Sequence, residues 1–154
     1  MVDITMNATI EQAKVEMGRI IVPFGVLTNE ELHQLGYQLE ELMGSIITSH
    51  ELVDTGRLRD SFYFQIRNDQ REQSIKLLSD VEYLPYVLGV EFGSFSGDDI
   101  TDPHGIIREY LNAGNELVQQ ALTQASNSNT AEHVISVNDS AKVLKAYKSY
   151  TGGQ

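Results

Sequence analysis

The stretch FYFQIRNDQREQSIKLLSDVEY, residues 62–83, contains two runs in which apolar and polar side chains alternate. The apolar positions are Phe62, Phe64 and Ile66 in the first run and Ile75, Leu77, Val81 and Tyr83 in the second. A period of two is typical of a β-strand with one buried face. The polar segment NDQREQ, residues 68–73, separates the runs and suits a hairpin connection. We therefore predict a short antiparallel strand pair.

A helix is predicted on the N-terminal side of this pair, over about residues 28–49. The sequence TNEE begins it with a capping box, in which the Thr28 hydroxyl accepts from the Glu31 amide and the Glu31 side chain reaches back. An apolar stripe at three-to-four spacing then consists of Leu32, Leu35, Leu39, Leu42, Met43 and Ile46. The opposite side carries Glu30, Tyr37 and Glu41 and no Lys or Arg. This pattern indicates a core-packing helix with an acidic, solvated face.

A second helix is predicted on the C-terminal side, over about residues 103–125. Asp102 suits the N-cap and Pro103 the first helical position, where a missing amide costs nothing. The apolar stripe consists of Ile106, Ile107, Tyr110, Leu117, Val118 and Ala121. Gly114 lies within this stripe and costs about 1 kcal/mol of helix propensity relative to Ala. We expect close approach by another backbone to compensate for it.

The two ends of the chain are expected to form arms, residues 1–27 and 126–154, outside a core domain of residues 28–125. Residues 2–10 alternate as a strand would, but TIEQ, residues 9–12, also offers a capping box, and both possibilities remain open. Near the other end, HVISV suits a short strand and DSAKVLKAYKSY a short amphipathic, basic helix. Its candidate contact residues are Lys142, Lys145, Tyr147, Lys148 and Tyr150. Docking onto an acidic neighbour and simple solvation are both better explanations of these lysines than DNA contact.

The charge of the chain opposes broad binding to nucleic acid. The 154 residues include 22 acidic and 11 basic ones, with a net charge of −11. Affinity for phosphates comes from Lys and Arg, so most of this surface should repel DNA. Neither an export signal nor a run of about 18 apolar residues occurs, so we expect a soluble protein that is not exported and contacts no membrane. Cysteine is absent, which excludes disulfides and thiolate metal sites.

One segment, SGDDITDPH, gathers groups that could bind a metal ion: Asp98, Asp99, Asp102 and His104. Oxygen ligands this close could hold Ca²⁺ or Mg²⁺. The spacing is not that of an EF-hand, however, and Asp102 already serves as a helix cap, so a solvated loop is the better interpretation. His33, His50 and His133 are scattered, and no nucleophile, zinc or phosphate-binding motif occurs. The sequence therefore indicates neither an active site nor a cofactor.

The basic turn DTGRLRDSF, residues 54–62, reads as the corner between the first helix and the strand pair. Thr55 can cap a single helical turn, and Gly56 allows a tight bend. Leu58 and Phe62 are four residues apart and can meet on one face. Arg57 and Arg59 then point in different directions. We expect each to pair with Asp54, Asp60 or Glu91, or with a neighbouring subunit.

Two segments together resemble the tailed-phage family of neck and tail-completion proteins, which join head to tail. In that family a T-G-x-L-R turn precedes a strand, and a Y-x-x-Y-V-E-x-G segment closes the sheet. DTGRLRDSF and VEYLPYVLGVEFGS match these motifs. The matching positions are Thr55, Gly56, Arg57, Leu58, Arg59, Tyr83, Tyr86, Val87, Glu91, Phe92 and Gly93. VLGVEFG carries a few extra residues where the family runs straight from tyrosine to glutamate.

The resemblance covers about residues 28–125 and implies a small α+β subunit without enzymatic activity. With the elements above, it predicts an antiparallel sheet of about four strands packed against two main helices, about 28–49 and 103–125, with extended N- and C-terminal arms. It also implies a homo-oligomeric ring, a hexamer or dodecamer, between the connector and the tail tube of the virion. DNA would pass through its lumen without specific binding, and assembly would occur in the host cytoplasm.

Two alternatives belong to other classes of protein. One is a small metal-dependent hydrolase built on Asp98, Asp99, Asp102 and His104. The other is a soluble adaptor that binds a single partner through the basic tail.

Overall fold

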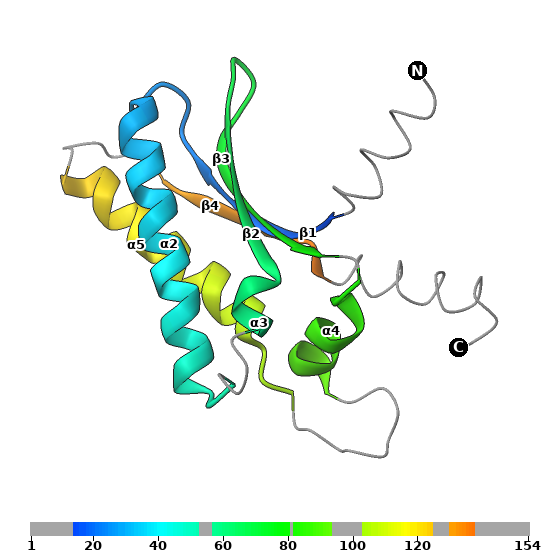
Figure 1. The fold of residues 1–154 in the computed structure, drawn as a ribbon. Coiled ribbons are helices and arrows are strands. Elements are labelled where there is room, and N and C mark those ends of the chain that lie inside the picture. The colour runs from blue at the N-terminus through cyan, green and yellow to red at the C-terminus, as the bar shows by residue number, and fades with distance from the viewer. Residues whose placement is uncertain (1–13, 53–56, 81, 94–102, 125–129, 138–154) are drawn as a thin grey trace, which may run out of the picture.

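The computed structural model describes residues 14–52, 57–80, 82–93, 103–124 and 130–137 (Figure 1). Its elements are β1 (Lys14–Val22), α2 (Asn29–Ser49), α3 (Arg57–Asp60), β2 (Phe62–Asn68), β3 (Gln73–Asp80), α4 (Leu84–Phe92), α5 (Ile106–Gln124) and β4 (Glu132–Ile135). The strands form one sheet in the order β2-β3-β1-β4, and all neighbours are antiparallel. The predicted α+β class is confirmed.

The predicted strand pair is present as β2 and β3. Phe64 lies opposite Leu77 and Ile66 opposite Ile75, so the alternating apolar positions share one face. In the connecting turn, the Asp69 carboxylate accepts from the amides of Arg71 and Glu72 at 2.8 and 2.9 Å. β3 ends at Asp80, before the Val81 and Tyr83 that the alternation had included.

The sheet also uses segments that we expected to lie in the arms. β1 is a central strand, and β4 pairs with it at the edge, so residues 14–22 and 132–135 belong to the core sheet. The pattern of β1 escaped prediction because its pairing with β3 is irregular between Glu16 and Gly18, which interrupts the alternation. Residues 2–10 and the predicted basic helix lie outside the described residues.

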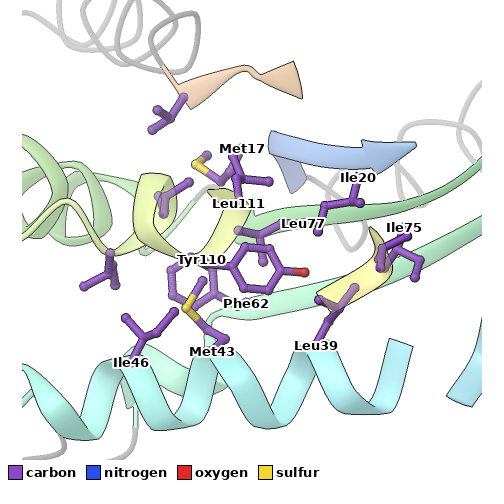
Figure 2. Packing of buried hydrophobic residues seen from close by; sticks show 14 of the residues in the cluster. Met17, Ile20, Leu39, Met43, Ile46, Phe62, Ile75, Leu77, Tyr110 and Leu111 are labelled. Atoms are coloured by element: carbon purple, nitrogen blue, oxygen red, sulfur yellow. The ribbon is translucent and has the colours of Figure 1, made fainter. Parts of the chain in front are cut away.

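The hydrophobic core lies between one face of the sheet and the two long helices (Figures 1 and 2). α2 packs over β2, and α5 packs over β1 and β4. Fully buried side chains from the sheet, from α2 and from α5 meet in this core. They include Ile20, Leu39, Met43, Ile75, Leu77, Tyr110 and Leu111. The stripes predicted on both helices face this core.

The capping box predicted for α2 is present. The Thr28 hydroxyl accepts from the Glu31 amide at 3.1 Å, and the Glu31 carboxylate accepts from the Thr28 amide at 2.9 Å. These bonds satisfy two amides that the helix itself leaves unpaired.

Replacing Thr28 with alanine is expected to lower the free energy of unfolding by about 1 kcal/mol, because the Glu31 amide loses the hydroxyl that accepts its hydrogen bond, while the backbone amide of residue 28 keeps its bond to Glu31. Urea denaturation measures the loss. Ser45→Ala is the matched control, since Ser45 is exposed within α2, about one turn before its end, and alanine favours helix there. Equal losses in the two variants would contradict the capping role.

Helix α5 differs from its prediction at the start and at Gly114. It begins at Ile106 rather than Pro103, because Gly105 has a φ of 59° and the chain turns there. Gly114 is approached by side chains and not by another backbone: a β-carbon there would lie 2.5 Å from Cδ1 of Ile20 and 2.9 Å from Cδ2 of Leu39. Glycine at this position lets β1 and α2 pack closely on α5.

Candidate functional site

The second motif segment, residues 83–93, forms helix α4 and does not close the sheet as the resemblance implied. Tyr83 precedes the helix and contacts Tyr86 edge-to-face, with ring centroids 5.0 Å apart. Val87 is fully buried. Gly93 has a φ of 100° and ends the helix by donating to the Gly89 carbonyl at 2.7 Å. The segment forms a helix because Pro85 suits its first turn and the residues around it are apolar on all sides.

Glu91 joins α4 to the start of α5. Its carboxylate is buried and accepts hydrogen bonds from the amides of Ile107 and Arg108, at 2.7 and 3.4 Å. The first amides of a helix lack partners within the helix and attract negative charge. Glu91 therefore caps α5 from another helix, the function that the sequence assigned to Asp102, which lies outside the described residues.

Two backbone bonds hold the same junction together. The His104 amide donates to the Val90 carbonyl at 2.8 Å, and the Gly105 amide donates to the Glu91 carbonyl at 3.3 Å. The last turn of α4 is thus fastened to the residues that lead into α5. Glu91 contributes both its backbone and its side chain to this junction.

The surroundings of Glu91 act on its charge in opposite directions. Burial raises the pKa of the carboxyl, while the two amides and the charges of Arg108 and His50 oppose that shift. The Arg108 Nε atom lies 3.9 Å from the carboxylate, and its guanidinium lies over the Phe92 ring at 4.9 Å. Phe92 thereby positions the cation that faces Glu91.

The raised pKa gives a direction to the effect of pH. The folded protein binds the Glu91 proton more tightly than the unfolded chain, whose glutamate has its usual pKa near 4.5. Protonation of Glu91 therefore favours folding. Its contribution is complete below the usual pKa and is lost as the pH rises through the raised one.

We expect the free energy of unfolding of the natural protein, relative to that of Glu91→Gln, to fall as the pH rises from the usual glutamate pKa through the raised pKa of Glu91. The glutamine variant is the reference because it cannot titrate at position 91 and leaves every other carboxyl in place. Urea denaturation of both proteins between about pH 4 and pH 7 measures the difference. An opposite slope would show that the helix amides and Arg108 outweigh burial.

A second group of polar side chains lies at the same junction. His50 follows α2, and its Nδ1 shares a hydrogen bond of 3.1 Å with Nδ1 of His104. The Glu109 carboxylate accepts from Nε2 of His50 at 2.8 Å. These hydrogen bonds link the end of α2 to the start of α5. The bond between the two Nδ1 atoms requires that one of them carries a hydrogen and the other accepts it.

The residues of the first motif segment, 54–62, differ in how far the structure bears out what was expected of them. Leu58 is buried, and it lies with Phe62 in the core cluster as expected. Arg57 begins α3, whereas Thr55 and Gly56 lie outside the described residues. Arg59 was expected to pair with Asp54, Asp60 or Glu91, or with a neighbouring subunit, and Asp54 lies outside the described residues. Within the described residues it forms no ion pair, and its guanidinium lies against Gly44 of α2.

The remaining candidate residues divide between described and undescribed parts of the chain. Asp98, Asp99 and the tail residues Lys142, Lys145, Tyr147, Lys148 and Tyr150 lie outside the described residues. Within the described ranges, no group of three or more metal-binding side chains is assembled. No helix of these ranges has the length and apolar character needed to span a membrane.

Sequence reasoning missed the polar links made by His50, Arg108 and Glu109. His50 and Glu109 are 59 residues apart, so no local motif connects them. The available signal was positional: His50 ends one predicted helix, and Arg108 and Glu109 begin another. No protein-family model, curated protein or solved structure matches the chain.

Proposed function

We propose that this chain is a structural virion protein of a tailed bacteriophage, the ring-forming subunit of the neck that joins the head connector to the tail. The proposal begins from the likeness of residues 54–62 and 81–94 to the neck and tail-completion family. It makes the chain a component of the particle and not an enzyme.

The structural role of Glu91 is the observation that best supports the proposal. Glu91 is the acidic residue among the matched motif positions; it is buried, and its carboxylate accepts from the first amides of α5. Leu58 of the first motif and Val87 of the second are also buried. Both motifs therefore contribute buried side chains to the fold, although the second forms helix α4 and does not close the sheet.

The surface charge fits a channel through which DNA passes. Glu30, Glu31, Glu40 and Glu41 are all exposed on α2, which contains no Lys or Arg. A wall of this sign repels phosphate, so DNA could move past it without binding. We assign the exposed side of α2 that carries Glu30 and Glu41 to the lumen of the proposed ring.

Native mass spectrometry of the purified chain tests the ring. A single closed oligomer, with a mass six or twelve times that of the 17.2 kDa subunit, is the expected result. A monomer that persists up to high concentration would contradict the proposal. Raising the salt concentration separates a specific ring from loose electrostatic association, because screening weakens contacts between exposed charges.

A further inference from the structure

The two edge strands of the sheet suit each other in direction. β2 and β4 are the edges, and within the described residues no further strand pairs with either. Three successive antiparallel pairings make β2 and β4 run in opposite directions. A second copy placed beside the first in the same orientation would therefore set its β2 antiparallel to the first copy's β4. An edge strand presents unpaired amides and carbonyls that can accept such a partner.

We propose that subunits join head to tail by pairing β4 of one copy with β2 of the next. This inference rests on the proposed ring and specifies its interface. A contact between two different surfaces, repeated from copy to copy, gives a ring when the rotation between copies closes and an open filament when it does not. The occupant of each edge is thus a second copy of this chain.

The faces of the two strands limit the possible registers. Val134 lies opposite Arg19, and Ile135 lies opposite Gly18, a position that faces Leu111 of α5. Ile135 therefore points to the helix-covered face and Val134 to the other face. On β2, Phe64 shares the helix-covered face with Leu77, and Gln65 lies on the opposite face. Pairing must match Ile135 with the Phe64 side and Val134 with the Gln65 side.

One register also matches charge and apolar contact. Setting Val134 opposite Gln65 places Ile135 opposite Phe64 and Glu132 opposite Arg67. Opposite charges facing each other across antiparallel strands are favourable. A shift by two residues in one direction would instead place Glu132 opposite the carboxylate of Asp69.

The edges expose side chains that this pairing would cover. Val134 and Ile135 are 37% and 38% exposed on β4, and Tyr63 is 38% exposed on β2. Beside β2, a hollow of about 350 Å³ against α2 is lined in part by Tyr37, Phe64 and Ile66. Ile135 of a neighbouring copy would lie at this hollow. Pairing would thus remove apolar surface from water as well as satisfy the strand edges.

Cysteine cross-linking tests the interface, because the chain has no cysteine of its own. The variant carrying both Gln65→Cys and Val134→Cys is oxidised and run on a non-reducing gel. Directly opposite residues place their β-carbons about 4.5–5.5 Å apart, close to disulfide range. Within one subunit the two positions are separated by three strand spacings, about 14 Å, so no internal bond can form.

The expected result is a ladder at multiples of 17.2 kDa, with no dimer from either single variant alone. Lys76→Cys with Val134→Cys is the matched control and should give no ladder, because Lys76 lies on β3, inside the sheet. Two results would overturn the inference. The first is a dimer from Gln65→Cys alone, which means that β2 pairs with β2. The second is the absence of a ladder from the double variant when native mass spectrometry shows that this variant forms rings. Absence of any oligomer of the natural chain would instead contradict the proposed function.

Discussion

Glu91→Ala is expected to lower the free energy of unfolding by about 2–4 kcal/mol, because it leaves two helix amides without their acceptor and a gap where the carboxylate was. The Ile107 amide makes the shorter bond, 2.7 Å, in buried surroundings where water does not replace a lost partner. Arg108 and His50 would also lose the negative charge that they face. Loss of this one side chain should loosen α4 from α5.

Glu91→Gln is the matched control for this prediction. The glutamine carbonyl can still accept from the Ile107 amide, and the volume is nearly unchanged. We expect it to cost less than about 1.5 kcal/mol, the usual net contribution of one hydrogen bond. Urea denaturation of the three proteins gives both differences. If alanine and glutamine cost the same, the capping bonds contribute little to stability.

Gly18→Ala is expected to cost about 1–3 kcal/mol, the usual range for overpacking a filled core. A β-carbon at Gly18 would lie 2.6 Å from the Val134 carbonyl oxygen and 2.5 Å from Cδ1 of Leu111. A flexible side chain such as Leu111 can move away. The Val134 carbonyl belongs to the backbone of β4, so the added methyl group should weaken the pairing of β4 with β1.

Gly89→Ala is the control for Gly18→Ala. Gly89 lies in α4, and nothing lies within 4 Å of a β-carbon placed there. Alanine should stabilise the protein by up to about 1 kcal/mol through helix propensity. Thermal unfolding should move in opposite directions in the two variants. Destabilisation by both would mean that space around the glycine does not decide the outcome.

Elements that are specified by local chemistry could be predicted from the sequence. Helix α2 begins where Thr28 and Glu31 form their reciprocal bonds, and these need only four consecutive residues. The β2–β3 pair follows from alternation on both sides of a polar turn. In each case the signal and the structure lie in the same short stretch.

Features that depend on distant residues could not be predicted in this way. Glu91 was noted as a motif position, but nothing near it in sequence shows that it caps a helix starting 15 residues later. α4 was expected to close the sheet because the resemblance was taken from sequence motifs. β1 was missed because its irregular pairing hides the strand pattern. Tertiary packing decided each of these outcomes.

Electron microscopy of a deletion mutant tests the proposed place of the chain in the particle. The gene would be deleted from the phage that encodes it, and the particles in the lysate imaged with and without the natural chain supplied from a plasmid. We predict separate heads and tails in the mutant and joined virions after complementation. Joined, infectious virions in the absence of the chain would contradict it.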